Sequence, residues 1–175
     1  MLGQMKLASV QRSTPAMAAA LPNLPMAATV MVRLIRITVA GLTDYFEPVF
    51  RSIGMNENAF HILCLLTAAE HGCASPSQLS GLVGTSRANM TRILEQLERE
   101  AYVSRAQDAR DARRHVIQIT QEGRNATVAA VPRIVAPLEL AFSDLTEEEF
   151  ATLDGLLRKT VKSFDKGASP MKAAL

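Results

Sequence analysis

The sequence predicts a mainly helical protein with a small β-sheet. Hydrophobic residues make up 48% of the 175 residues but aromatic residues only 5%, with no Trp, which favours an aliphatic helical core. Two neighbouring helix patterns meet at a turn around Gly84. A strand of alternating character at 115–119 follows four arginines within 105–114. This order of two helices, a short turn between them, a basic loop and a strand is typical of a winged helix-turn-helix. We expect further helices on either side of it.

The N-terminal part divides into an arm and two helices. Residues 1–27 are polar or rich in Ala and Pro, so we expect a flexible arm. Apolar residues recur at helical spacing through 28–53 and predict a helix that bends near Pro48. Asn56 is expected to cap the next helix, which ends at His71-Gly72. Its expected buried stripe consists of Phe60, Leu63, Cys64 and Leu66.

Capping residues mark the two helices of the helix-turn-helix. Ser75 followed by Pro76 is a favourable helix start, and Gly84 supplies the turn after it. Ser86 is expected to cap the second helix. The apolar positions expected to face the core are Leu79 and Leu82 in the first of these helices and Met90, Ile93, Leu94 and Leu97 in the second.

The C-terminal part predicts the sheet and two more helices. The two wing strands are expected at 102–103 and 115–119. Thr120 should cap a helix that runs to about 142. Its two prolines, Pro132 and Pro137, should kink or split it. Thr146 and Glu149 form a capping box for a last helix, and the tail 166–175 is expected to be disordered.

Side chains suited to DNA lie on the second helix of the helix-turn-helix and in the loop after it. Arg can pair with guanine, and Asn or Gln with adenine, while hydroxyls near helix starts suit phosphates. Arginines in the wing suit the minor groove or the phosphate backbone, and Asp111 can hold Arg113 in place. The candidates are Ser86, Arg87, Asn89, Thr91, Arg92 and Gln96 in the helix, Ser75 and Ser77 before it, and Arg110, Asp111, Arg113 and Arg114 in the wing.

Charge and composition argue against an enzyme, a disulfide-rich protein and a membrane protein. The formal net charge is only +2, from 19 basic and 17 acidic residues, so the local excess in 105–115 matters more than the total. No Ser-His-Asp set, Gly-rich phosphate loop or paired-carboxylate pocket is evident, so an enzyme is not expected and no cofactor is predicted. Two cysteines make no disulfide framework, which fits a cytoplasmic protein. Prolines and arginines interrupt the apolar stretch 17–40, so neither a membrane span nor a signal peptide is expected.

The chain resembles the MarR family of bacterial winged-helix regulators over about residues 30–165. The resemblance rests on Ser75-Pro-Ser-Gln-Leu79, on Gly84 through Arg92, on Leu97-Glu98 and Arg105, on Asp108, Arg110, Asp111 and Arg113, and on Ile119 through Gly123. It implies a homodimer on a palindromic operator, with Arg92 reading bases and Arg113 in the minor groove. It also implies repression that is relieved by small phenolic or lipophilic ligands, oxidants or metals.

The sequence also indicates domain boundaries, and it differs from the family pattern at one position. The boundaries expected are a flexible arm at 1–27, a dimerisation region at 28–54 and 120–165, a DNA-binding domain at 55–119 and a disordered tail at 166–175. The departure is Ala101, where the family usually has Gly after the second helix of the motif. A positive φ at Ala101 would cost about 1 kcal/mol, so this helix is expected to end differently.

The effector and two other functional classes stay open. A ligand cleft could be lined by Arg36, Tyr45, Phe46, Met55 and His61, although the same residues suit an ordinary dimer core. His71 and Cys73 could sense an oxidant or a metal in a redox- or metal-responsive regulator. Cys64 is expected to be a buried structural thiol. A winged-helix module for protein–protein assembly, without operator binding, is the alternative from another class.

Overall fold

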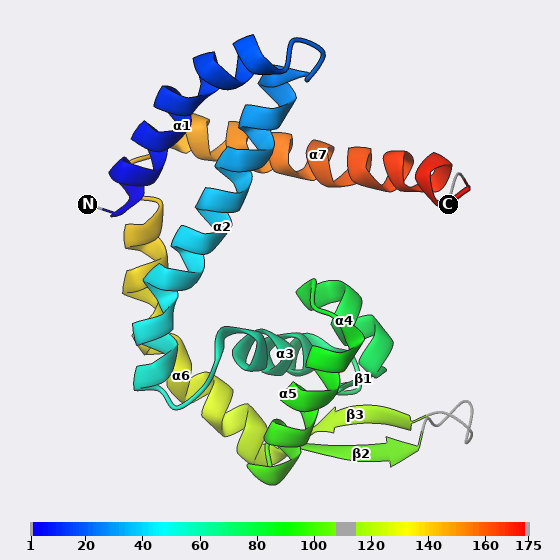
Figure 1. The fold of residues 1–175 in the computed structure, drawn as a ribbon. Helices are drawn as coiled ribbons and strands as arrows, with labels where there is room; N and C mark the ends of the chain where they lie inside the picture. The colour runs from blue at the N-terminus through cyan, green and yellow to red at the C-terminus, as the bar shows by residue number, and fades with distance from the viewer. Residues whose placement is uncertain (1, 108–114, 174–175) are drawn as a thin grey trace. The chain divides into compact units, whose positions relative to one another are not determined.

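The computed structural model describes residues 2–107 and 115–173, and it confirms the mainly helical fold with a small sheet. The chain divides into two compact units, 1–131 and 132–175. In chain order (Figure 1) the elements are α1 (Leu2–Ala20), α2 (Met26–Ser52), α3 (Glu57–Ala68), β1 (Cys73–Ala74), α4 (Pro76–Val83), α5 (Arg87–Arg99), β2 (Val103–Gln107), β3 (His115–Ile119), α6 (Gln121–Ala141) and α7 (Glu147–Ala173).

The winged-helix core lies where α3, α4 and α5 meet the sheet. The predicted stripe of α5 is buried at all four positions, and so is Leu79 of α4. Two expectations were wrong. Leu82 is 68% exposed, because α4 is two turns long and its last turn borders an open apolar groove. Cys64 is only half-buried, whereas the other predicted positions, Phe60, Leu63 and Leu66, are buried. Ile62, which was not predicted, is fully buried as well.

The sheet has three antiparallel strands in the order β1-β3-β2. Residues of β2 and β3 pair from Val103 opposite Ile119 to Gln107 opposite His115, which confirms the second wing strand at its predicted bounds. The first wing strand is longer than expected and runs to Gln107. Strand β1 was not predicted, because two residues are too few to show an alternating pattern. It places Cys73 opposite Gln118 of β3, so Cys73 is a strand residue.

Helix α5 ends in a left-handed residue that is not glycine. Ala101 has φ +59°, so the expectation of a different helix end was wrong. The amide of Ala101 donates to the carbonyl of Glu98 (3.1 Å), and the amide of Tyr102 donates to that of Leu97 (2.9 Å). These two bonds form the Schellman motif, which requires the left-handed residue. The Thr120 hydroxyl donates to the Ala101 carbonyl (2.7 Å) and ties this turn to the start of α6.

Residues 2–20 are helical, which corrects the expectation of a flexible arm. Helix α1 packs against α2 in antiparallel fashion, since Lys6 pairs with Asp44 (3.6 Å) and Arg33 donates to the Ser13 hydroxyl (2.9 Å). Val10 of α1 is buried. Periodicity did not reveal this helix because its apolar residues do not gather on one face. Helix α2 continues through Pro48 to Ser52, near the predicted end.

The C-terminal helices begin at the predicted caps; α6 ends close to its predicted end, and α7 extends further than predicted. The Thr120 hydroxyl accepts from the Gly123 amide (3.0 Å) at the start of α6, and this helix is not split at its two prolines. The capping box of α7 is present: Glu149 accepts from the Thr146 amide (2.9 Å), and the Thr146 hydroxyl accepts from the Glu149 amide (3.2 Å). Helix α7 continues to Ala173, so the tail from 166 is helical over its described part, contrary to expectation.

One described helix meets the length and apolar composition of a membrane span. An 18-residue window of α2 has a mean hydropathy of 1.5. The sequence analysis did not predict a membrane span in this part of the chain. The C-terminal end of this helix belongs to the winged-helix core, because Phe46 and Phe50 are buried and the ring of Phe50 lies 5.8 Å from that of Phe60 in α3. The exposed part of α2 carries large apolar side chains, among them Met31, Val32 and Val39.

Candidate nucleic-acid interface

Two capped helices and a tight turn build the helix-turn-helix. The Ser75 hydroxyl accepts from the Gln78 amide (3.3 Å), and the Gln78 side chain accepts from the Ser75 amide (2.9 Å), which forms a capping box at the start of α4. Gly84 ends α4 with φ +71°, a conformation that glycine adopts without strain. The Ser86 hydroxyl accepts from the Asn89 amide (3.2 Å) and starts α5. The predicted caps of both helices are therefore confirmed.

The polar face of α5 is partly organised by bonds within the helix. Ser86, Arg87, Thr91 and Arg92 are exposed, while Asn89 is half-buried. The Asn89 amide donates to the Thr85 hydroxyl (2.7 Å), and its oxygen accepts from a guanidinium nitrogen of Arg92 (3.1 Å). These bonds hold Asn89 between the turn and Arg92. An exposed guanidinium at this position can reach the edge of a base in the major groove.

Gln96 lies further along α5, and both polar atoms of its side-chain amide form hydrogen bonds. Its nitrogen donates to Glu100 (3.0 Å), and its oxygen accepts from the Asn56 amide (3.5 Å). Base contacts in a helix-turn-helix come from the N-terminal residues of the second helix. Gln96 therefore faces the loop before α3, whereas Ser86, Arg87 and Thr91 near the start of α5 are exposed to solvent.

The wing is anchored at its base by an ion pair. Arg105 on β2 lies 3.1 Å from the carboxylate of Glu98 on α5. His115 and Gln107 form the last described pair of the two strands and are both exposed. Arg110, Asp111, Arg113 and Arg114, the predicted wing contacts, lie outside the described residues. They stay predictions.

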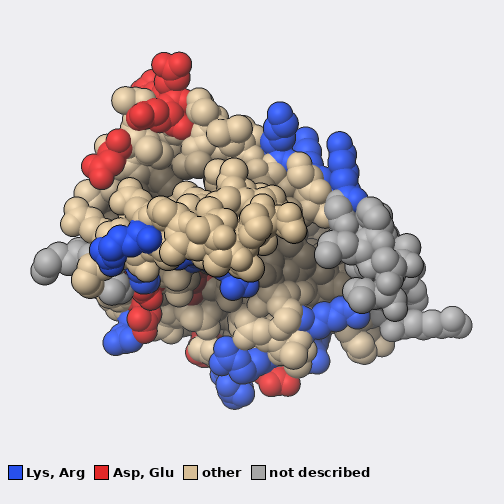
Figure 2. Space-filling model, turned by 45° about the horizontal axis from the view of Figure 1, so that its top comes forward, with Lys and Arg blue, Asp and Glu red and all other residues tan. Residues whose placement is uncertain are grey.

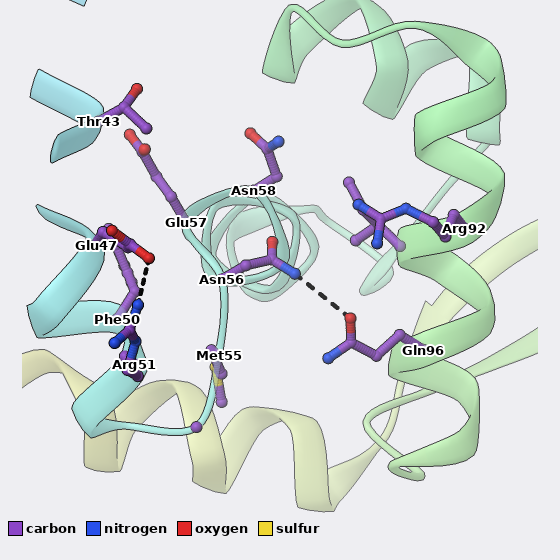
Figure 3. A pocket seen from close by; sticks show the side chains of 12 residues that line it. Thr43, Glu47, Phe50, Arg51, Met55, Asn56, Glu57, Asn58, Arg92 and Gln96 are labelled. Atoms are coloured by element: carbon purple, nitrogen blue, oxygen red, sulfur yellow. Dashed lines mark hydrogen bonds and ion pairs between the residues drawn. The ribbon is translucent and has the colours of Figure 1, made fainter. Parts of the chain in front are cut away.

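A pocket of about 660 Å³ opens beside Arg92 (Figure 3). Its floor contains Phe50, Met55 and Ile93, which are all buried. Figure 3 shows Arg92 and Gln96 reaching in from α5, with side chains of α2 and of the start of α3 opposite them. The pocket is lined by Thr43, Glu47, Phe50, Arg51, Gly54, Met55, Asn56, Glu57, Asn58, Arg92, Ile93 and Gln96.

This pocket overlaps little with the predicted ligand cleft. Met55 is the only one of the five predicted cleft residues that lines it. Phe46 is buried instead, with its ring 4.9 Å from that of Tyr45 in an edge-to-face contact. Arg36 and His61 are exposed side chains outside this pocket. The polar residues at 56–58 were missed as lining residues, because the sequence marked them only as a helix start.

The two thiols differ in their positions. Burial raises the pKa of the Cys64 thiol, so this group is less reactive than an ordinary cysteine near neutral pH. Cys73 lines the apolar groove beside Leu82. Among residues 2–107 and 115–173, no group of three or more His, Cys, Asp and Glu side chains could hold a metal ion.

Figure 2 shows where the described basic and acidic side chains lie on one face of the molecule. Lysines and arginines stand there in several separate groups, with acidic side chains elsewhere on the same face. This agrees with the small net charge of +2. Affinity for a polyanion must therefore arise from local groups, of which the face of α5 is one.

Comparison with known proteins identifies the domain that contains these helices. Residues 55–115 match the model of the MarR family. The transcriptional repressor MprA of Escherichia coli K12 is 27% identical over 144 residues, which cover 82% of each chain.

Two solved structures share the fold. Sco3205 of Streptomyces coelicolor, a MarR family regulator solved with DNA, has a TM-score of 0.72 at 20% identity and covers 80% of this chain and 89% of its own. BpsR of Bordetella bronchiseptica, whose DNA binding is regulated by 6-hydroxynicotinic acid, has a TM-score of 0.66 at 21% identity and covers 73% and 90%. Together with the matched domain and the MprA similarity, this shared winged-helix fold shows that residues 55–115 form a MarR family domain.

Proposed function

We propose that this protein is a sequence-specific, dimeric DNA-binding regulator of transcription, and that it acts as a cytoplasmic repressor released by a small ligand. The observation that carries the proposal is the exposed start of α5, where Arg87, Thr91 and Arg92 stand clear of the core behind the Ser86 cap. The similarity to the repressor MprA and the shared fold with a DNA-bound regulator support it. DNA contacts would come from residues 55–119, including the wing arginines.

Exposed apolar side chains support a dimer. Helices α2, α6 and α7 each present several large hydrophobic residues to solvent, and exposed apolar patches often mark protein–protein contacts. A second copy that packs these helices together would bury them. The exposed residues are Met31, Val32, Val39 and Leu42 on α2, Val128, Val131, Val135, Leu138 and Leu140 on α6, and Leu153, Leu156, Leu157, Val161 and Phe164 on α7. Light scattering in solution should give twice the chain mass of 19.0 kDa.

Operator binding is tested by anisotropy titration of the DNA upstream of the protein's own gene, with random duplex as competitor and salt varied. We expect tight, competitor-resistant binding that weakens as salt rises. Arg92→Gln should lower affinity for the operator by about 10- to 100-fold with little change on random duplex. Arg113→Gln should lower it as well if that side chain enters the minor groove.

Arg12→Gln is the matched control, because Arg12 is an exposed arginine on α1, outside the winged helix. It removes the same charge and should leave operator affinity within about twofold. Binding to the operator no tighter than to random duplex would overturn the proposed function and favour an assembly module.

A further inference from the structure

The turn between α4 and α5 is fixed to a buried serine. Ser80 lies in α4, and its hydroxyl donates to the Thr85 carbonyl (2.7 Å). In return, the Thr85 amide donates to the Ser80 carbonyl (3.2 Å). Both backbone polar groups of Thr85 are therefore bonded to one core residue, and the half-buried Thr85 side chain starts from a fixed position.

Asn89 extends this chain of hydrogen bonds to Arg92. Its side-chain nitrogen donates to the Thr85 hydroxyl (2.7 Å), and its side-chain oxygen accepts from a guanidinium nitrogen of Arg92 (3.1 Å). The backbone amide of Asn89 donates to the Ser86 cap (3.2 Å), which fixes the helix turn that carries it. The hydrogen bonds thus run without interruption from buried Ser80 to the exposed guanidinium of Arg92.

This arrangement does not suit Asn89 as a reader of adenine. A bidentate contact with adenine requires the donor and the acceptor of the amide to face the base together. In the structure they face Thr85 and Arg92, and the side chain is half-buried. The amide would have to turn away from both partners to reach a base. Asn89 is therefore placed to support its neighbour.

Arg92 keeps what it needs for guanine while it is held. A guanidinium carries several N–H donors, and the bond to Asn89 engages only one of its nitrogens. Because the Asn89 amide is neutral, this bond leaves the positive charge of Arg92 uncompensated and available to DNA. An arginine side chain loses much rotational freedom when it binds, and a bond that restrains it beforehand lowers that cost.

We propose that Thr85 and Asn89 are positioning residues that hold Arg92 ready for one guanine of the operator, and that Asn89 itself reads no base. The inference rests on the proposed function and adds how its base contact is preorganised. It makes a requirement that direct reading does not. Loss of the Asn89 side chain must weaken discrimination at the base pair read by Arg92, whereas a reading Asn89 would affect a different base pair.

The experiment uses the full-length protein and labelled duplexes from the DNA upstream of its own gene, with each base pair replaced in turn. Anisotropy titration gives the Kd for every duplex, and Arg92→Ala first identifies the pair at which discrimination depends on Arg92. We expect Asn89→Ala to weaken the unchanged duplex about tenfold and to lose discrimination at that same pair. Affinity for random duplex should stay within about twofold.

A double-mutant cycle separates positioning from contact. Asn89→Ala should cause no further loss in the Arg92→Ala background, because its effect passes through Arg92. The variant keeps its fold, since the bond to the Ser86 cap uses the backbone amide and alanine favours a helix. Asn125→Ala is the matched control, because Asn125 is an exposed asparagine on α6, and its operator affinity should stay within about twofold.

Thr85 provides a second, independent variant. Thr85→Val removes the hydroxyl that accepts from Asn89 and leaves the backbone bonds to Ser80 in place. We expect it to weaken operator binding about threefold, with the loss again confined to discrimination at the Arg92 base pair. Thr85→Ser keeps the hydroxyl and should restore operator affinity to within about twofold of the unchanged protein.

Three results would overturn the inference and leave the proposed function standing. The first is loss of discrimination at a second base pair in Asn89→Ala, or an equal loss of affinity with and without Arg92. The second is an Asn89→Ala variant whose operator affinity stays within about twofold of the unchanged protein. The third is an Arg92→Ala variant that keeps full discrimination at every base pair. If the unchanged protein bound the duplex no tighter than random DNA, the proposed function would fall first, and the inference with it.

Discussion

Replacing Ala101 by glycine should stabilise the protein. Ala101 sits at the left-handed position of the Schellman motif that ends α5, with φ +59°. Its side chain is exposed, so no packing is lost when the methyl group is removed. The amide bonds to Glu98 and Leu97, and the bond from the Thr120 hydroxyl, involve only the backbone of this turn and persist in the variant.

The size of the effect follows from two opposing contributions. An L-residue in the left-handed region costs about 1–2 kcal/mol, and glycine avoids this cost. Glycine also has more freedom in the unfolded chain, which destabilises the folded state by about 0.4–1 kcal/mol. The net gain in the free energy of unfolding, taken from the midpoints of these two ranges, is therefore about 0.8 kcal/mol. For a chain of 175 residues this raises Tm by about 1–4 °C.

Urea and thermal unfolding of both proteins measure this gain, at equal protein concentration because a dimer's stability depends on it. Ala88→Gly is the control, since Ala88 is also an exposed alanine and lies inside α5. This change should destabilise the protein by up to about 1 kcal/mol, because glycine disfavours a right-handed helix. If Ala101→Gly were no more stable than the unchanged protein, or fell as far as Ala88→Gly, strain at Ala101 would be refuted.

Three further predictions concern other parts of the chain. Gly123→Ala should lower the free energy of unfolding by about 2–3 kcal/mol, because a Cβ there would overlap the Tyr102 carbonyl. Gly81→Ala is the control: a Cβ at Gly81 meets nothing within 4 Å, so this change should be neutral or stabilising. Alkylation of Cys64 near neutral pH, followed by mass spectrometry, should be slower than for a cysteine peptide, since its pKa is raised. The pKa of Glu149 is lowered by its bonds at the cap of α7, so its stabilisation is present above the ordinary value of 4.5 and is lost as pH falls through the folded value. Glu149→Gln should remove that part of the acid dependence in circular dichroism, and an unchanged profile would argue against it.

Local signals predicted the winged helix well. The caps at Asn56, Ser86 and Thr120 are confirmed, because a cap depends on residues within one turn of the chain. The buried stripe of α5 is confirmed for a similar reason, since a strongly amphipathic helix shows its core face through spacing alone. These elements place the exposed start of α5, and so the candidate interface could be inferred before the fold was known.

What the sequence did not reveal depends on contacts between distant segments. Helix α1 has no apolar stripe and is held to α2 by Lys6 with Asp44 and by Ser13 with Arg33, which are pairs that composition does not indicate. The pocket beside Arg92 is assembled from three elements separated along the chain. The contact between Asn56 and Gln96 joins residues 40 apart, and no periodic pattern points to it.

The end of α5 shows how such distant contacts override a local preference. Alanine disfavours the left-handed turn by about 1 kcal/mol, and local reasoning therefore predicted a different helix end. Two bonds formed after the turn outweigh this cost: the Thr120 amide donates to the Tyr102 carbonyl (3.0 Å) and the Thr120 hydroxyl to the Ala101 carbonyl (2.7 Å). Thr120 thus joins the start of α6 to the end of the helix that presents Arg92.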